Sequence, residues 1–593
     1  MGTQNITITG SKVSGNKATG AGSQGGGIVS YGSKDITLDN TIVTDNTADT
    51  GAGLYCLSTN GTHIVLKNNT HIDANIANAG GGGLYLYSLR KDAPIHLDLL
   101  DSFICKNKAN KANACGGGVF AYDGAIITAK NSSISNNCAA ANGGGLYLLN
   151  NSGTILADLQ NAFIENNSAA GWAGGVFAYN GVTLKANNTS ISNNSASNAG
   201  GILVWKDSSA ELVNSKINGN TATTEGGGVY AINGTVLVTD SDISNNTAGT
   251  NGGGLNMSAS ALTAKHNTIA NNHADKSGGG IFLNVSSAEL EGNTITENKV
   301  TGSGGGIYSY DGSGEEKIGL TLKDNIITKN EAGSTGGGLA ITNKNQTITL
   351  DGDIIEGNTS KTYGGGIHMG SDSTMTMTGG SISNNHADKL GGGLYGASRK
   401  PITLNGTKVQ SNTANSGAGI YLYSKTELEA GEGTVISDNK ANISGGGIFN
   451  NGSILTLKDG TVLENNTAGK FGGGLYNTGT TTVESGATLM NNTAEEYGGG
   501  LYNKGKATVE SGAKLYNNHA ALAGDDIYLA GKNSTLTLTK VGDDWMLDDC
   551  GHKINGWFAD LLDARWDADG KQEHVINLCL LYTSDAADEV SPV

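Results

Sequence analysis

A short glycine-rich phrase recurs along the chain at a nearly constant interval. It consists of about three glycines, one aliphatic residue and usually an aromatic residue, as in residues 81–85, 304–308 and 498–502. Most copies follow one another after 26 to 28 residues, and self-similarity at such a period is typical of a solenoid rather than of a globular domain. The last glycine of each copy lies at position 27, 53, 83, 118, 145, 175, 201, 228, 254, 280, 306, 338, 366, 393, 419, 447, 474 or 500, and a degenerate copy occupies residues 524–528.

Two further patterns complete each repeat. An asparagine signature precedes the glycines and reads aliphatic, two variable residues, asparagine, one variable residue and usually alanine, as in residues 243–248, 382–387 and 463–468. A third stretch alternates apolar and polar residues, for instance residues 182–185. Three short strands separated by Gly, Asn, Asp and Ser turns then make one coil per repeat. We predict an all-β parallel β-helix of about 19 coils of 26–28 residues, with three short parallel sheets.

The composition argues against other repetitive or disordered chains. The 93 glycines are accompanied by only 3 prolines, whereas collagen needs much proline and a strict three-residue period. Aliphatic residues that recur in register exclude disorder. Leucine-rich repeats have a similar period but need a leucine framework and often a helical return. Glycine runs in every repeat oppose a helix, because each glycine costs about 1 kcal/mol relative to alanine.

The two signatures have structural explanations. Successive glycines permit positive φ and remove side chains at a corner where the backbones of adjacent coils approach closely. Asparagines stacked from coil to coil can form a hydrogen-bonded ladder that satisfies buried turn amides. The aliphatic residue after the glycines never becomes polar, so we expect it to point inward.

Strand alternation sends the next residue to the outer face, which predicts an exposed aromatic stripe. One interpretation is that neighbouring rings stack and only stiffen the sheet, with about 0.5 to 1 kcal/mol per pair. The other is a contact surface for a sugar or a protein. The candidate ligand-contact residues are Tyr55, Tyr85, Phe120, Tyr147, Phe177, Tyr230, Phe282, Tyr308, Tyr395, Tyr421, Phe449, Tyr476, Tyr502 and Tyr528.

Charge and cysteine usage exclude several classes of partner. The formal net charge is −17 and the chain has no run of basic residues, so we expect no nucleic-acid partner. The six cysteines occupy different places within their repeats, so we expect neither a disulfide framework nor a metal cluster. No apolar run approaches the roughly 20 residues of a membrane span.

The sequence contains no convincing cluster of catalytic residues. A glycoside hydrolase needs two carboxylates about 5 to 9.5 Å apart, but Asp351 and Asp353 share one coil and Glu464 lies in a distant one. A calcium-dependent lyase with an arginine base would need Arg90 or Arg399, and each lies in a variable loop. We therefore predict no catalytic, cofactor-binding or metal site.

Three histidines share one position of the repeat. His273, His386 and His519 follow the second asparagine of their signatures. They are separated by four and five coils, or roughly 19 and 24 Å at the usual strand spacing. We therefore expect that they do not act together on one substrate or metal ion.

The repeats predict three segments. Residues 1–531 form the β-helix, and we expect it to be truncated at its N-terminus because residues 1–10 are already repeat sequence. Residues 532–578 lose the period and form either a cap or the start of another module. Residues 579–593 look like the translation of a transposon-type sequencing adapter, so we expect them to be an artefact.

The pairing of motifs resembles a known family. An apolar residue followed by Asn-Asn-x-Ala and then Gly-Gly-Gly-aliphatic, as in residues 243–255, is similar to the repeats of chlamydial polymorphic outer membrane proteins. It also resembles adhesin-like surface proteins of gut bacteria and archaea within the pectin-lyase-like class. The resemblance covers residues 1–531 and implies a right-handed, surface-exposed or secreted β-helix that mediates adhesion. Here Ile or Leu usually replaces the family's Phe.

Two functions follow from these observations. The first is an extracellular, non-catalytic adhesin or display stalk that binds a glycan or a host or neighbouring surface protein through an extended face. The alternative is a carbohydrate-active enzyme, either a polysaccharide lyase or a glycoside hydrolase, because such enzymes share the scaffold. Charged side chains clustered in adjacent coils would favour the enzyme, and an unbroken aromatic face would favour binding.

Overall fold

The computed structural model describes residues 4–311, 318–342, 344–370 and 372–539, and three short strands beyond them, β77 (Trp545–Met546), β78 (Lys553–Ile554) and β79 (His574–Ile576). The chain divides into two compact units, unit 1 (Met1–Thr294) and unit 2 (Ile295–Val593). The described residues form β-strands and turns without any α-helix. None of them belongs to a helix that could cross a membrane.

Each coil of unit 1 contains four strands in a fixed order. One coil consists of β23 (Val176–Tyr179), β24 (Val182–Asn187), β25 (Ser190–Ser192) and β26 (Ser195–Ala196). The equivalent strands of successive coils pair in parallel and form four sheets, here named D, A, B and C in that chain order. Chain neighbours are therefore sheet neighbours, as predicted.

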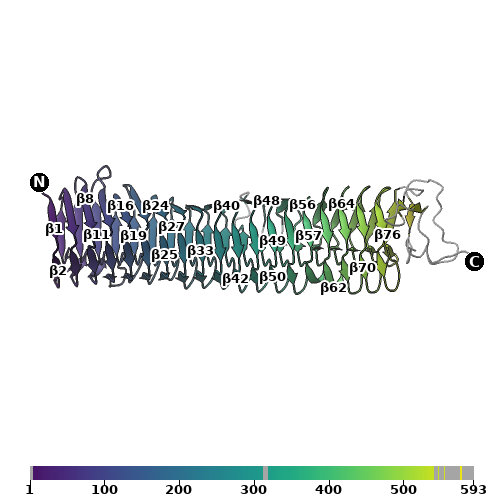
Figure 1. Ribbon diagram of the computed structural model, residues 1–593, viewed down its shortest axis with the longest axis horizontal. Helices are drawn as coiled ribbons and strands as arrows, with labels where there is room; N and C mark the ends of the chain where they lie inside the picture. The colour runs from purple at the N-terminus through teal and green to yellow at the C-terminus, as the bar shows by residue number, and fades with distance from the viewer. Residues whose placement is uncertain are drawn as a thin grey trace, which may run out of the picture. The chain divides into compact units, whose positions relative to one another are not determined.

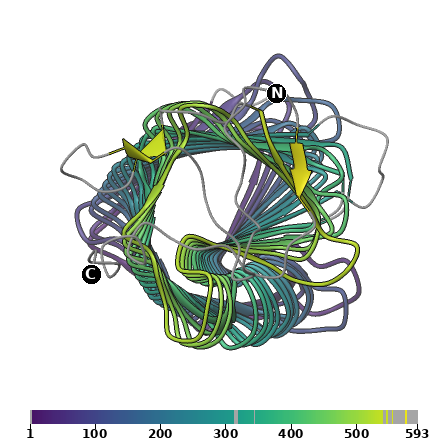
Figure 2. The same ribbon diagram turned by 90° about the vertical axis from the view of Figure 1, so that its right-hand side faces the viewer.

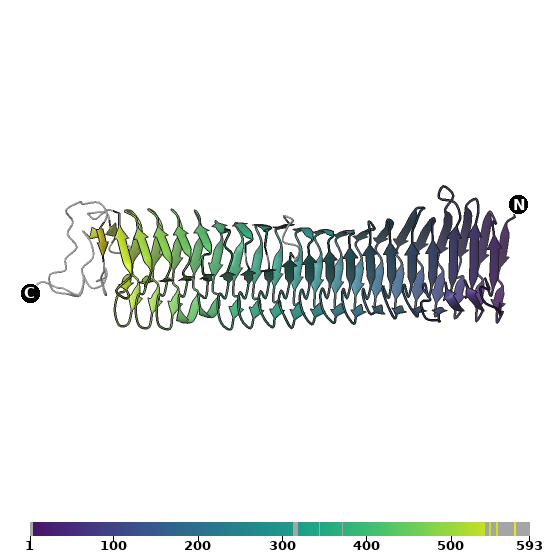
Figure 3. The ribbon, with the colours of Figure 1, turned by 180° about the vertical axis from the view of Figure 1, so that it is seen from behind.

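Unit 2 repeats the same order. One of its coils consists of β47 (Leu339–Thr342), β48 (Gln346–Asp351), β49 (Ile354–Glu356) and β50 (Thr359–Ser360), and each strand pairs in parallel with its equivalent in the next coil. The labelled sheet C strands such as β50 form the lowest row of short arrows in Figure 1, and Figure 3 shows the stacked strands from behind. Seen along the stack, the green and yellow coils of unit 2 trace closed loops with one indented side (Figure 2). The two units together contain 19 sheet D strands, one per coil.

The prediction of three sheets is wrong, because the asparagine signature ends in a fourth strand. β34 (Thr247–Ala248) is an example, and like most sheet C strands it is two residues long. Two residues are too few to show the alternation that identifies a strand in sequence. This strand still pairs in register, with Thr247 opposite His273 and Ala248 opposite Ala274.

The core lies inside the coils and consists of the aliphatic residues that alternate along the strands. Leu54, Val119 and Ile202, which follow the glycine phrase, are all completely buried, as predicted. Burial of one such side chain stabilises the fold by about 1.5 to 3 kcal/mol. Because every coil buries such a side chain, this contribution to stability recurs from coil to coil.

The asparagine ladder is confirmed in both units. Asn220 donates from Nδ2 to the carbonyl of Ile191 at 2.8 Å and to Oδ1 of Asn246 at 3.0 Å, and its backbone N–H donates to the same Oδ1 at 3.0 Å. Asn412 in unit 2 makes the same bonds to Ile382 and Asn439 at 2.9 to 3.0 Å. Each amide therefore satisfies buried backbone groups of two neighbouring coils.

The glycine corner is as crowded as predicted. Gly252 has φ +67°, in the left-handed region. A Cβ on Gly253 would lie 2.5 Å from the carbonyl oxygens of Gly279 and His273, closer than any carbon can approach. Only glycine therefore fits where successive coils meet at this corner.

A second amide ladder near the end of unit 2 was not predicted. Asn450, Asn477 and Asn503 are completely buried on sheet D, where most other coils carry an apolar residue. Nδ2 of Asn450 donates to Asn477 at 2.9 Å, and Nδ2 of Asn477 donates to Asn503 at 2.8 Å. The first ladder ends in the degenerate repeat, where Asn518 donates to Asp526 at 2.9 Å.

The predicted last strand is present as β76 (Thr535–Leu538). It pairs in parallel with β72 (Lys506–Val509) and in antiparallel fashion with β79. Apart from residues 532–539 and the three short strands, the segments 532–578 and 579–593 lie outside the described residues. The predictions of a cap or module and of an adapter artefact therefore stay predictions.

Candidate binding surface

The predicted aromatic residues form a column on the outer face of sheet D in each unit. Consecutive rings stack from coil to coil, with centroids 4.6 Å apart and planes 7° apart for Tyr85 and Phe120 in unit 1. In unit 2 the corresponding values for Tyr476 and Tyr502 are 4.8 Å and 9°. Parallel pairing places each ring directly beside the next one, because the strands stay in register.

The expectation that this stripe is exposed is wrong. Tyr85, Phe120, Phe282, Tyr308, Phe449, Tyr476, Tyr502 and Tyr528 are half-buried. The other six, Tyr55, Tyr147, Phe177, Tyr230, Tyr395 and Tyr421, are buried, with at most 9% of each residue exposed.

The rings are covered by the segment that precedes the glycine triplet. In unit 2 Tyr363 stacks on Tyr395 at 4.8 Å, and Phe471 lies 5.0 Å from the ring of Tyr502. In unit 1 Trp172 lies 6.1 Å from Tyr230. The covering residues also pair from coil to coil. This segment has no periodic pattern of its own, so the sequence did not reveal the cover.

The tyrosines of the column have raised pKa values because they are withdrawn from water. Burial raises the pKa of Tyr85 and of Tyr502 to about 12, and neighbouring tyrosines add to the effect. Tyr230 also has a raised pKa, first because of burial and second because its hydroxyl donates to Glu225 at 2.6 Å. The column thus behaves as a second apolar layer outside sheet D, which supports the stacking interpretation for these residues.

Unit 1 carries another row of apolar side chains on the same face, two residues further along each strand. This outer row is paired in register from one coil to the next. Tyr31 is 62% exposed and the others are half-buried. The outer row consists of Tyr31, Leu57, Tyr87, Tyr122, Leu149, Tyr179, Trp205 and Ile232.

Rings of the outer row contact each other mainly edge to face. Tyr87 and Tyr122 are 4.9 Å apart at 71°, and Tyr179 and Trp205 are 5.1 Å apart at 86°. Trp172 of the covering segment stacks on Trp205 at 5.4 Å. These contacts fix the rings while leaving part of each one in contact with water, so the outer row is a preformed apolar surface.

Polar groups border the outer row. The hydroxyl of Tyr122 accepts a hydrogen bond from Nδ2 of Asn151 at 2.7 Å. Oδ1 of Asp123 accepts from the backbone N–H groups of Asn151 and Ser152 at 2.5 and 3.1 Å. Lys206 Nζ lies 5.4 Å from the centroid of Tyr179. An apolar surface with such a border suits a ligand that has both apolar and hydroxyl-rich faces.

The outer row was not predicted from the sequence. Its signal is the alternation Leu-Tyr-Leu-Tyr at residues 84–87 and Val-Phe-Ala-Tyr at residues 119–122 and 176–179. Only the first aromatic residue of each pair recurs in most coils, and this recurrent residue belongs to the buried column.

The acids and arginines considered for catalysis lie in separate places. Arg399 forms two hydrogen bonds with Asp372, at 2.7 and 2.6 Å, and Arg90 is paired with Asp92 at 2.7 Å. Asp353 is buried, which raises its pKa to about 6, although hydrogen bonds from Asn325 at 2.8 and 2.9 Å oppose the shift. Asp353 lies in the turn between β48 and β49 and does not face solvent.

The three equivalent histidines each have a local partner. His273 lies 3.0 Å from Asp275, His386 lies 3.1 Å from Asp388, and His519 lies 3.6 Å from Asp525. The parts of the chain that the structure describes contain no group of three or more His, Cys, Asp or Glu side chains that could hold a metal ion. Cys56, Cys105, Cys115 and Cys138 are free thiols.

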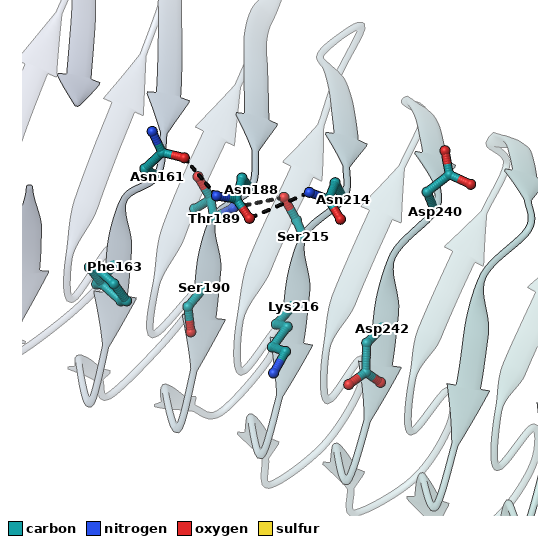
Figure 4. Close-up of a pocket in the computed structure, with 10 residues that line it drawn as sticks. All are labelled: Asn161, Phe163, Asn188, Thr189, Ser190, Asn214, Ser215, Lys216, Asp240 and Asp242. Carbon is teal, nitrogen blue, oxygen red and sulfur yellow. Dashed lines mark hydrogen bonds between the residues drawn. The ribbon is translucent and has the colours of Figure 1, made fainter. Parts of the chain in front are cut away.

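Two shallow hollows lie on other faces. In unit 1 a hollow of about 350 Å³ lies between the turn residues Asn161 and Asn188 and the sheet B residues Phe163 and Lys216 (Figure 4). In unit 2 a hollow of about 540 Å³ on sheet C has Glu331 among its lining residues.

Comparison with known proteins identifies the fold and leaves the function open. Residues 154–318 and 200–364 match the family model described as right handed beta helix region. Together with the four parallel sheets, this match confirms the predicted right-handed parallel β-helix. No curated protein matches the chain.

Proposed function

We propose that this right-handed β-helix is a non-catalytic binding protein of the cell surface or the extracellular space. It acts as an adhesin or display stalk and binds a glycan or a neighbouring surface protein. The observation that supports this function is the outer row of unit 1, where eight consecutive coils from Tyr31 to Ile232 present a partly exposed apolar side chain. Contiguous apolar surface of this kind usually marks an interaction site.

The binding surface proposed here differs from the one expected from the sequence. The buried column of stacked rings lies beside the outer row on the same face of sheet D, and the outer row makes the contact. Tyr122 and Trp205 are the residues on which we expect binding to depend most, because aromatic side chains dominate the energetics of contact surfaces.

An adhesion assay with the full chain tests this function. Beads coated with the protein are applied to immobilised mucin and to epithelial cell monolayers, and retained beads are counted under flow. We expect retention on at least one surface, and we expect Tyr122→Ala combined with Trp205→Ala to reduce it by about fivefold or more.

Tyr423→Ala is the matched control. Tyr423 holds the same position in its sheet D strand, is 49% exposed, and lies in unit 2, away from the outer row. Its loss should leave retention unchanged. Absence of retention on both surfaces, or an equal loss in the control, would contradict the proposed function.

A second candidate is a carbohydrate-active enzyme, which the hollow in unit 2 favours. Glu331 and Asp388 both line it, and Lys299 Nζ lies 2.8 Å from Glu331. Asp388 lies two residues beyond His386, which is in register with Glu331 two coils away, so the two acids belong to coils about 10 Å apart at the usual strand spacing. This is slightly beyond the roughly 6.5 to 9.5 Å that separate the carboxyl groups of inverting glycosidases.

A turnover assay separates the two candidates. The chain is incubated with pectins, uronans and mucin glycans, and new reducing ends and unsaturated uronate are measured. If the wild type releases products and Glu331→Gln abolishes this release, the protein is a hydrolase and the adhesin proposal is wrong. Retention on mucin without turnover supports the adhesin.

A further inference from the structure

An exposed row of amides runs along the turn between sheets A and B in unit 1. Nδ2 of Asn188 donates to Oδ1 of Asn161 at 2.6 Å, and Nδ2 of Asn214 donates to Oδ1 of Asn188 at 3.4 Å (Figure 4). These residues have φ between 47° and 50°, a conformation that asparagine tolerates better than most residues. The backbone therefore fixes the spacing and the direction of the amides.

This row forms one wall of the hollow in unit 1. The other wall is the outer face of sheet B, where Phe163, Ser190, Lys216 and Asp242 stand in consecutive coils. Phe163 is 49% exposed. The hollow thus spans four coils, about 14 Å at the usual strand spacing, and has an aromatic ring at one end. We call it the amide groove.

The groove retains hydrogen-bonding capacity of both kinds. The amide row uses one N–H and one carbonyl lone pair of Asn188, and an amide has two of each. The hydroxyl of Ser190 donates to Glu165 at 2.8 Å, and its oxygen can still accept a hydrogen bond. The groove therefore offers both donors and acceptors to a ligand.

We propose that the amide groove binds a neutral oligosaccharide. Sugar hydroxyls both donate and accept hydrogen bonds and match the spare donors and acceptors of the groove. The C–H face of a pyranose ring matches the exposed ring of Phe163. Lys216 shares the hollow with Asp240 and Asp242, which both belong to the next coil, so the local charge disfavours a polyanion. The volume of about 350 Å³ has room for a short oligosaccharide.

This site is separate from the outer row, which lies on sheet D. It could bind sugar even if the outer row binds a protein or nothing at all. Binding that depends on Phe163 but not on Tyr179 of the outer row therefore supports the amide groove alone.

Calorimetric titration of the full chain tests the proposal. The probes are hexasaccharides of β-linked glucose, β-linked mannose, β-linked N-acetylglucosamine and, as the acidic comparison, α-linked galacturonate. We expect at least one neutral hexasaccharide to bind, and we expect Phe163→Ala to weaken it by about tenfold. Asn188→Gly should weaken it too, because glycine keeps the positive φ and removes only the amide.

Ile354→Ala provides the matched control. Ile354 holds the same place in its sheet B strand as Phe163 and is 37% exposed, so its loss should change the affinity by less than about twofold. Circular dichroism verifies that each variant keeps its β-structure. The proposal is overturned if no neutral hexasaccharide binds, or if Phe163→Ala and Asn188→Gly both leave binding intact. Binding of galacturonate alone, abolished by Lys216→Ala, would also overturn it.

Discussion

The outer faces of sheet D differ between the two units although their coils are built alike. In unit 1 the outer row is apolar over eight consecutive coils. In unit 2 the same positions hold Tyr310, Thr342, Tyr423 and Asn451, and strands such as β51 (Ile367–Met369) end before reaching that position.

The comparison separates what the fold demands from what it leaves free. Stacking requires the same residue at the same interior place, and Asn220 in unit 1 and Asn412 in unit 2 make the same bonds to their neighbours. Outward positions beyond the buried column carry no such requirement. A difference confined to those positions therefore points to a role in binding rather than in folding.

The largest expected effect tests the equivalence of the interiors. Asn220→Ala and Asn412→Ala each remove an amide that satisfies several buried groups, and an unsatisfied buried group costs about 1 to 3 kcal/mol. We expect each variant to lower the free energy of unfolding by about 3 to 5 kcal/mol, measured by urea denaturation followed by circular dichroism.

Asn187→Ala is the control for this pair. Asn187 is exposed on sheet A, and its truncation should change the unfolding free energy by less than about 0.5 kcal/mol. Effects of Asn220→Ala and Asn412→Ala that differ by more than about 2 kcal/mol would show that the two interiors are not equivalent.

Asp353 in unit 2 should make the free energy of unfolding depend on pH in a way that unit 1 does not share. At the equivalent turn position of unit 1 stand uncharged residues such as Thr189 and Asn267. Because burial raises the pKa of Asp353 from 3.8 to about 6, the folded state holds this proton more tightly than the unfolded state. The protonated Asp353 therefore contributes up to about 3 kcal/mol to the free energy of unfolding. This contribution is fully present below pH 3.8 and is lost as the pH rises through about 6.

The measurement is the thermal midpoint of the wild type and of Asp353→Asn between pH 4 and 7. We expect the midpoint of the variant to rise relative to the wild type as the pH increases. Asp351→Asn, at an exposed position of the same coil, should show no such trend. Parallel curves for Asp353→Asn and the wild type would contradict the predicted linkage.

Much of this architecture can be predicted from the sequence, because residues that contact their own copies in the next coil must recur with the period of the repeat. Asn246 and Gly253 recur since each must hydrogen-bond to, or pack against, its own copy in the next coil. The two-residue strands of sheet C are too short to show the alternation that identifies a strand. The cover over the column depends on variable residues such as Trp172, and the amide groove depends on the turn that brings Asn188 beside Phe163. Such sites arise from neighbouring coils and have no fixed position in the repeat.

A smaller effect of opposite sign should come from His368 in unit 2. His368 occupies a half-buried place in the column of stacked rings, and its ring centroid lies 5.3 Å from that of Tyr395 with the planes 4° apart. Burial lowers the pKa of His368 from 6.5 to about 4. The folded state disfavours the charged ring. The contribution of neutral His368 to the free energy of unfolding is therefore fully present above pH 6.5 and is lost as the pH falls towards 4. Because the residue is partly exposed, we expect the loss to be about 1 to 2 kcal/mol.

His368→Tyr supplies the aromatic ring that most coils have in this column. We expect the variant to gain stability relative to the wild type between pH 6.5 and 4, measured by the urea midpoint. The control is His386→Thr at an exposed position of sheet C, which introduces the residue type found at the paired position of the next coil, Thr413. Its urea midpoint should change less with pH relative to the wild type. Equal trends in the two variants would contradict a role for burial.

The smallest expected effect on stability sharpens the contrast between the outer faces. Trp205→Ala in unit 1 and Tyr423→Ala in unit 2 remove side chains at the same strand position, and each should lower the unfolding free energy by about 1 kcal/mol, because Trp205 is only half-buried and Tyr423 is 49% exposed. Their effect on the surface should differ. Trp205 belongs to a continuous apolar row and contacts Tyr179 and Trp172, whereas the register partner of Tyr423 in the next coil is the polar Asn451. Trp205→Ala should therefore shorten retention on a hydrophobic interaction column more than Tyr423→Ala does. Equal retention of the two variants would mean that the outer row is not a continuous apolar surface, and the proposed binding site would have to lie on another face of unit 1.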